Sequence, residues 1–82
     1  MAGQMKLALR RLGETVAEGG MTMADVVQIR VSTTDLATCK ARYAVLLDAL
    51  AAVDCRPASL LAEVSALSDE DMLIEIEAVA MR

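Results

Sequence analysis

Apolar and polar residues alternate most regularly near the C-terminus. Between residues 72 and 81, one face of an extended chain would carry only apolar side chains, while the other face would carry Glu75 and Glu77. This period of two is typical of a β-strand with one buried face. Residues 59–67 alternate in a similar way and predict another strand. The acidic residues 69–71 predict a turn that joins the two strands.

Residues 3–18 carry apolar side chains at helical spacing. Met5, Leu9, Leu12 and Val16 are separated by four, three and four positions, so they would form one stripe along a helix. Two consecutive glycines at positions 19 and 20 predict its end.

A second helix is predicted to begin at Thr34 or Asp35, either of which can cap it, and to end near residue 53. Pro57 excludes its continuation. Its apolar stripe consists of Leu36, Cys39, Tyr43, Leu46 and Leu50.

Residues 26–33 are rich in β-branched side chains and predict a strand between the two helices. One face would carry Val27, Ile29 and Val31, and the other Gln28, Arg30 and Ser32. The order helix, strand, helix, strand, strand predicts a single α+β domain over residues 1–82, a two-layer sandwich with two helices on one face of a mixed sheet. The other sheet face would mix apolar and charged residues, which favours a partner subunit.

Composition narrows the choice of function. The chain has 82 residues, 56% of them apolar, with Tyr43 as its single aromatic residue. So much apolar surface is hard to bury in a small domain, which predicts a homo-oligomer. No segment is long enough to span a membrane and no signal peptide is apparent, so we expect a cytoplasmic protein. The net charge of −4 and the scattered basic residues argue against nucleic acid as a partner.

The absence of histidine excludes imidazole catalysis and histidine-based metal sites, and we expect neither a metal nor another cofactor. Cys39 and Cys55 lack metal-ligand spacing and are expected to be free thiols in a reducing compartment rather than a disulfide.

Several motifs together resemble those of the Rid family, also called YjgF. They are GMTMADVVQIRVSTTDL, RPASLLAEVSAL and IEIEAVA, with Tyr43 between the first two. Members of that family are also labelled endoribonuclease L-PSP or translation initiation inhibitor. The resemblance implies a chorismate-mutase-like α+β sandwich that forms trimers, with small-molecule sites in clefts between subunits.

The resemblance also implies an activity, the hydrolysis of reactive enamines and imines such as 2-aminoacrylate to a 2-keto acid and ammonia. In the family pattern an arginine holds the substrate carboxylate, which suits its bidentate guanidinium, and a glutamate positions the attacking water. The glutamate corresponds to Glu75 and the family's tyrosine to Tyr43.

Three departures from the pattern predict weak or lost imine deaminase activity. Ser59 stands at the position of the family's arginine, and Lys40 stands at the position of an asparagine. The family's N-terminal strands, with their glycine-containing site segment, are missing, because the chain begins where the family's first long helix begins.

Each candidate site residue also has a plainer interpretation. Glu75 either orients water or is a solvated carboxylate paired with Arg30 across the sheet. Arg56 either supplies the guanidinium that Ser59 cannot, or is a surface residue before a proline. Lys40 either anchors an anion or is an exposed helical lysine.

Tyr43 either borders the site or belongs to the core, where its hydroxyl would need a partner if buried. A nucleophilic Ser59 is disfavoured because the chain has no histidine. Three classes of function remain open. The first is an oligomeric imine deaminase, and the second is a non-catalytic binding or regulatory module that retains a ligand cleft. The third is a shortened relative that serves assembly alone, or whose missing strands come from elsewhere.

Overall fold

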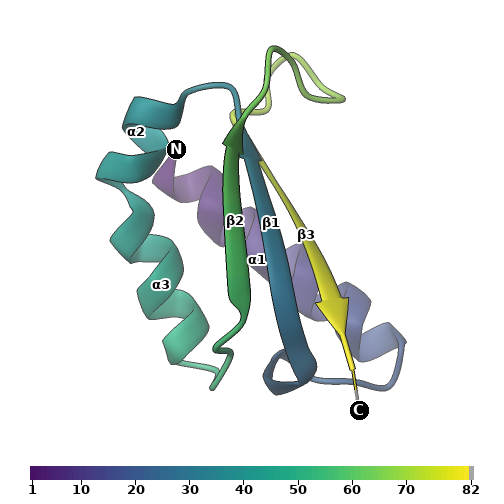
Figure 1. Ribbon diagram of the computed structural model, residues 1–82. Coiled ribbons are helices and arrows are strands. Elements are labelled where there is room, and N and C mark those ends of the chain that lie inside the picture. The colour runs from purple at the N-terminus through teal and green to yellow at the C-terminus, as the bar shows by residue number, and fades with distance from the viewer. Residues whose placement is uncertain (82) are drawn as a thin grey trace.

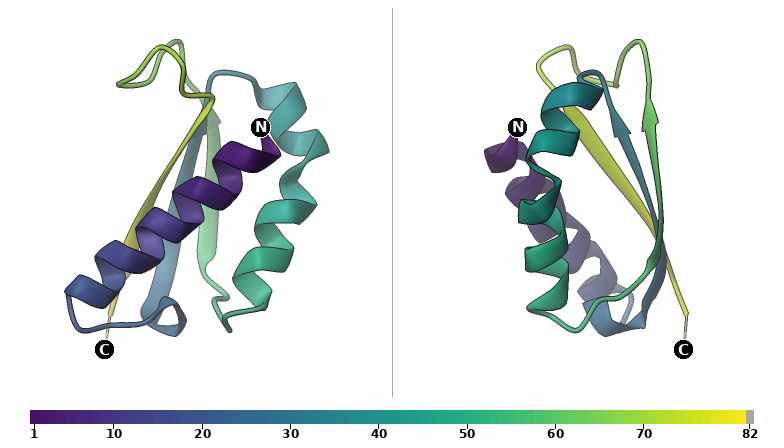
Figure 2. Two further views of the ribbon diagram at one scale, coloured as in Figure 1. Left: turned by 180° about the vertical axis from the view of Figure 1, so that it is seen from behind. Right: turned by 60° about the vertical axis from the view of Figure 1, so that its left-hand side comes forward.

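The computed structural model describes residues 1–81, which form one sheet and a layer of helices. The elements in chain order are α1 (Ala2–Glu18), the 3-10 turn η1 (Met23–Asp25), β1 (Val26–Thr33), α2 (Leu36–Ala41), α3 (Tyr43–Ala51), β2 (Ala58–Glu63) and β3 (Ile74–Ala80). The three main helices cover one face of the sheet and leave the other open (Figures 1 and 2). The predicted α+β two-layer sandwich is confirmed.

The sheet has the order β2-β1-β3, with β1 parallel to β2 and antiparallel to β3. The mixed sheet was predicted, but the two C-terminal strands do not pair with each other. The acidic turn leads from one edge of the sheet to the other, because β1 occupies the centre. β2 is also shorter than the predicted strand and ends at Glu63.

The alternation of residues 26–33 predicted correctly which side chains lie on each face of β1, except at the start of the strand. Ile29 and Val31 are buried against the helices, while Gln28 and Arg30 are exposed. A bulge between Val26 and Gln28 shifts the register there. Because an extra residue reverses the alternation, Val26 is buried and Val27 is 44% exposed, contrary to the prediction for Val27.

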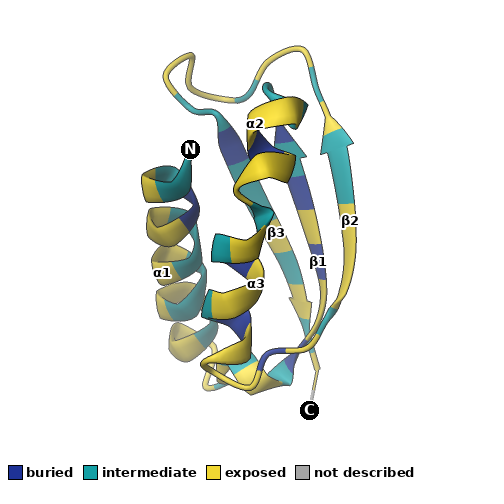
Figure 3. Ribbon diagram, turned by 90° about the vertical axis from the view of Figure 1, so that its left-hand side faces the viewer, coloured by how far each residue is buried: buried dark blue, intermediate teal, exposed yellow. Residues whose placement is uncertain are grey.

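The core lies between the sheet and the helices (Figure 3). Met5 of α1 and Leu46 and Leu50 of α3 are buried with Val31 and Ile74 of the sheet. The apolar stripes of the helices therefore face the apolar side of β3, as predicted. Both cysteines are buried free thiols, as the sequence indicated.

The second predicted helix is divided into α2 and α3 at Arg42, whose torsion angles are φ −109° and ψ 7°. No glycine or proline marks this break in the sequence. The first predicted helix agrees closely with α1, and Gly20 takes a positive φ of 78° just beyond its end.

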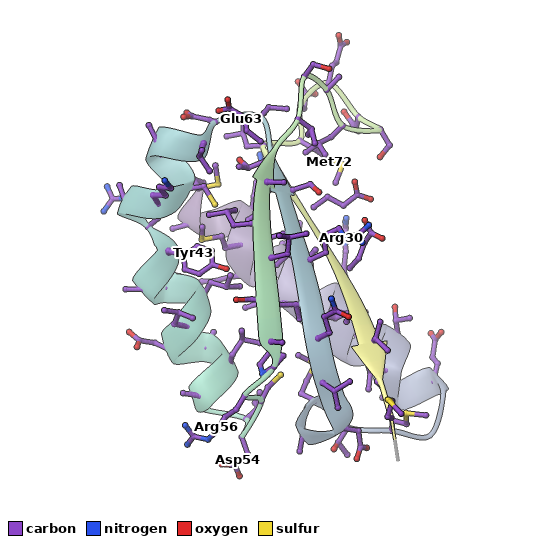
Figure 4. All side chains as sticks on the ribbon, viewed as in Figure 1. Arg30, Tyr43, Asp54, Arg56, Glu63 and Met72 are labelled. Carbon is purple, nitrogen blue, oxygen red and sulfur yellow. The ribbon has the colours of Figure 1, made fainter. Side chains whose placement is uncertain are left out.

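The open face of the sheet carries apolar side chains as well as charges. Leu60 is 50% exposed and Val79 is 49% exposed, and Arg30 projects beside them from the face turned toward the viewer in Figure 4. A monomer would leave these apolar side chains in water.

Candidate functional site

An open groove of about 470 Å³ runs between α1 and the outer edge of β3. Its apolar wall comes from α1 on one side and from Ile74 and Ile76 on the other. The groove is lined by Gln4, Leu7, Ala8, Arg11, Leu12, Thr15, Asp69, Asp71, Met72, Ile74, Glu75 and Ile76. Glu75, a predicted site residue, is among these lining residues.

Gln4 holds one end of this groove together. Its side-chain Oε1 accepts a hydrogen bond from the Leu73 N–H at 2.7 Å, and its Nε2 donates to the Asp71 carbonyl at 3.1 Å. One glutamine on the first turns of α1 therefore fixes the segment that leads into β3. The apolar periodicity of α1 gave no indication of this contact, since Gln4 lies outside its stripe.

The charged residues that line the groove are predominantly acidic. Asp69, Asp71 and Glu75 line it, and Arg11 is the one basic residue among its lining side chains. The one ion pair within 4.0 Å that residues 1–81 form joins Arg10 to Glu14 along α1, at 3.8 Å. Arg11 is exposed and forms no ion pair within 4.0 Å among residues 1–81, and sequence reasoning did not single it out.

Glu75 and Ser59 lie far apart in one chain. Ser59 is on β2 and pairs with the buried Ile29, whereas Glu75 is on β3 and pairs with Ser32. The two side chains therefore point to opposite faces of the sheet. Two strand spacings and three residues of register separate their Cα atoms by roughly 14 Å.

The cross-strand neighbour of Arg30 is Glu77, not Glu75. The plainer interpretation of Glu75 was a carboxylate paired with Arg30 across the sheet. Glu75 is not the direct cross-strand partner of Arg30, because its partner on β1 is Ser32. Glu75 is half-buried and Glu77 is exposed. Glu75 is thus the more sheltered of the two carboxylates on β3.

Arg56 and Tyr43 lie on the β2 side of the molecule (Figure 4), and so does α2, which carries Lys40 (Figure 1). Arg56 is exposed in the loop before β2, near the end of α3, and Lys40 is exposed on α2. Tyr43 begins α3 and packs against the core while remaining half-buried. None of the three borders the groove that contains Glu75.

Carboxylates also cap the start of α2. Asp35 accepts hydrogen bonds from the Thr38 N–H at 3.2 Å and from the Thr38 hydroxyl at 2.7 Å. The second of these bonds is the main reason why the pKa of Asp35 is lowered. Glu63 of β2 accepts from the Leu36 N–H at 3.1 Å. Asp35 was predicted as a cap, but the contribution of Glu63 depends on tertiary structure.

The two thiols are poor nucleophiles. Burial raises the pKa of both Cys39 and Cys55, and the thiolate is the reactive form. Within the described part of the chain, no three acidic or cysteine side chains are arranged to bind a metal ion. None of its helices is long and apolar enough to cross a membrane.

Comparison with known proteins places these features in a wider context. The model of the family described as endoribonuclease L-PSP matches residues 1–82. The solved YjgF gene product of E. coli is 29% identical, with a TM-score of 0.90 over 99% of this chain and 64% of that chain. Rv2704 from Mycobacterium tuberculosis, described as a member of the YjgF/YER057c/UK114 family, is 36% identical, with a TM-score of 0.79 over 96% of this chain and 65% of that one.

A further solved structure, E. coli TdcF with bound serine, is 26% identical, with a TM-score of 0.90 over 99% of this chain and 64% of that chain. The chain thus spans just under two thirds of the length of these three structures. No curated protein matches it.

Proposed function

Because the chain belongs to the endoribonuclease L-PSP family, which includes the YjgF proteins, we propose that it acts as a homo-oligomer, a trimer, that binds a small carboxylate-bearing molecule between subunits. Its activity as an imine deaminase is weak or lost. The substrate class of that residual activity would be 2-imino acids, converted to 2-keto acids and ammonia.

The separation of Ser59 and Glu75 carries this proposal. The two positions that the family pattern assigns to the substrate carboxylate and to the attacking water lie on opposite edges and opposite faces of one sheet. A ligand of three or four carbon atoms cannot contact both within one chain. Both can contribute only if one subunit supplies Ser59 and its neighbour supplies Glu75.

The open sheet face provides a surface on which subunits could meet. Leu60 and Val79 are about half exposed on that face, among charged residues that include Arg30. Burying apolar side chains of this size gains roughly 1.5–3 kcal/mol each when it is complete. Assembly through this face would bring the edges of neighbouring sheets together.

Ser59 limits the chemistry. A serine hydroxyl can donate one hydrogen bond to a carboxylate, whereas an arginine donates two charge-assisted bonds in a fork. A hydrogen bond to a charged group contributes about 1.5–3 kcal/mol. If the bond acts on the transition state, its loss lowers the rate by roughly ten- to a hundredfold.

The alternative is a binding or regulatory module without catalysis. The solved TdcF with bound serine is a relative that holds a small amino acid. A site with Ser59 in place of the cation could still bind such a ligand through neutral hydrogen bonds. We regard this as the second candidate function.

A coupled assay of 2-aminoacrylate hydrolysis tests the proposal. We expect slow turnover by the wild type, a roughly ten- to hundredfold increase in Ser59→Arg, and loss of the increase when Glu75→Gln is added. Glu77→Gln is the matched control on the same strand and should change little. Robust wild-type turnover that is abolished by Glu75→Gln would contradict the loss of activity, whereas no turnover in any variant would favour the binding module.

A further inference from the structure

One polar side chain is buried in the core, at the end of β1. Thr33 is 0% exposed and lies on the same face of the strand as Ile29 and Val31, because side chains alternate along a strand. A valine at position 33 would have nearly the same shape without the hydroxyl. Because a buried hydroxyl costs free energy unless it is hydrogen-bonded, packing alone does not explain a threonine here.

The hydroxyl of Thr33 binds two other segments of the chain. It donates a hydrogen bond to the Leu73 carbonyl at 2.7 Å and accepts one from the Asp35 N–H at 3.1 Å. Leu73 directly precedes β3, and Asp35 is the N-cap of α2. One hydroxyl therefore joins the end of β1 to the start of α2 and to the start of β3.

Leu73 is held at both of its backbone polar groups. Its carbonyl also accepts a hydrogen bond from the Thr34 N–H at 3.2 Å, and its N–H donates to Oε1 of Gln4 at 2.7 Å. The acidic turn at residues 69–71, just before Leu73, is exposed. These contacts therefore fix the point at which the exposed turn ends and the paired strand begins, and Thr33 supplies the one that comes from inside the core.

Glu75 lies two residues beyond this anchor. It pairs with Ser32, and Ile74 pairs with Thr33 itself. The ends of an element open at a lower free energy than its centre. The direction of the Glu75 side chain therefore depends on how firmly the start of β3 is held, whereas Glu77 lies two residues further into the strand and depends on the anchor less.

We propose that Thr33 is a positioning residue for Glu75, and this proposal rests on the proposed function, in which Glu75 orients the attacking water. The Thr33 hydroxyl fixes the Leu73 carbonyl and thereby the start of the strand that carries Glu75. Because Thr33 is fully buried, it acts through Glu75 and not on a ligand. A displacement of about 1 Å in a reacting group can lower a rate by about a hundredfold.

Kinetics in the Ser59→Arg background test the proposal, since that variant is expected to turn over 2-aminoacrylate faster than the wild type. Adding Thr33→Val should lower kcat by roughly ten- to a hundredfold. KM should change by less than about twofold, because the cation at position 59 still holds the substrate carboxylate. Adding Thr33→Ser, which keeps the hydroxyl, should restore most of the kcat.

Thr38→Val is the matched control, because it also removes a threonine hydroxyl at the start of α2. The Thr38 hydroxyl donates to the Asp35 carboxylate at 2.7 Å and has no hydrogen bond to Leu73. Its loss should leave kcat within about twofold. Equal losses of kcat in Thr33→Val and Thr38→Val would show a general effect on stability, and a raised KM with unchanged kcat would show an effect on binding; either result overturns the proposal.

A measurement that does not depend on turnover separates this proposal from the proposed function. The side-chain carboxyl carbons of glutamate are labelled with ¹³C and observed by NMR in the full chain. The Glu75 signal should shift or broaden in Thr33→Val and return in Thr33→Ser, while the Glu77 signal stays in place. If Ser59→Arg shows no turnover, the proposed deaminase activity is refuted, and the Glu75 signal alone decides the role of Thr33.

An unchanged Glu75 signal in folded Thr33→Val would refute the positioning role. If Thr33→Val does not fold, Gln4→Ala takes its place in both measurements, because it releases the N–H of the same residue, Leu73. Gln4 lies on α1, outside the core that Thr33 occupies. A Glu75 signal and a kcat that are both unchanged in Gln4→Ala would then show that the anchor at Leu73 does not position Glu75.

Discussion

The contact between Gln4 and the segment before β3 gives the sharpest prediction for stability. In Gln4→Ala, the N–H of Leu73 loses its acceptor at 2.7 Å. Leu73 is half-buried, so water replaces that acceptor only in part. An unsatisfied donor of this kind costs about 1–3 kcal/mol, and the better helix propensity of alanine offsets only a few tenths of this.

Gln4→Glu is the informative partner variant. It keeps an oxygen for the Leu73 N–H but loses the Nε2 that donates to the Asp71 carbonyl at 3.1 Å. Because Asp71 is exposed, water can replace that bond. A carboxylate oxygen in the place of Nε2 would, however, be repelled by that carbonyl oxygen and by Asp69 and Asp71, which line the same groove, so the Glu variant should also be less stable than the wild type. Lys6→Ala, on an exposed position of α1, should lie within about 0.5 kcal/mol of the wild type.

Urea unfolding at fixed protein concentration measures these differences, since association would make the midpoint depend on concentration. A loss of 1–3 kcal/mol in a domain of this size lowers Tm by roughly 4–8 °C per kcal/mol. Amide exchange at Leu73 should accelerate in Gln4→Ala and not in Lys6→Ala. Equal stability of Gln4→Ala and Lys6→Ala, or a Glu variant as stable as the wild type, would refute the reasoning.

Three further predictions concern the core, the thiols and assembly. Leu46→Ala, at a fully buried position, should reduce the free energy of unfolding by about 2–5 kcal/mol, as measured with urea. Because burial raises the pKa of Cys39 and Cys55, their neutral form contributes stability that is fully present below the ordinary thiol pKa of about 8.5. This contribution is lost as the pH rises through the raised pKa values, so above about pH 8.5 the wild type should lose more stability with rising pH than the double alanine variant. Light scattering should show an oligomer at micromolar concentration that Leu60→Lys or Val79→Lys dissociates, whereas a wild-type monomer would contradict the proposed assembly.

The periodic parts of the fold were predictable because burial imposes them residue by residue. The alternation in β3 placed Ile74 and Ile76 on the helix side and Glu75 and Glu77 on the open side, and the structure agrees. The stripe of α1 likewise predicted that Met5 is buried. Such patterns require no knowledge of which elements are neighbours.

The strand order, the bulge in β1 and the break between α2 and α3 were not predicted. They depend on which elements are neighbours, and the pattern of apolar and polar residues does not specify this. The position of β1 between β2 and β3 is a matter of strand pairing, and the alternation of each strand is the same in either order. The bulge that turns Val27 outward is a local insertion in that pairing. The break at Arg42 has no glycine or proline to indicate it.

For the candidate site, the sequence predicted which residues to consider but not where they lie relative to one another. Resemblance to a family identified Glu75 and Ser59, but their positions on opposite edges follow from the sheet order. Gln4 and Arg11 were missed because each is a polar residue on a helix whose apolar stripe dominates its pattern. Their place in the groove depends on how α1 lies against β3.

The central claim is that a ligand site forms between subunits, with position 59 from one chain and Glu75 from the next. The direct test is the turnover of 2-aminoacrylate by mixed oligomers, made by unfolding and refolding the wild type together with the double variant Ser59→Arg/Glu75→Ala. Neither pure protein has both an arginine at position 59 and Glu75, but some interfaces of the mixture do. We predict that the mixture turns over faster than either pure protein, and a rate equal to the weighted mean of the two would contradict the account.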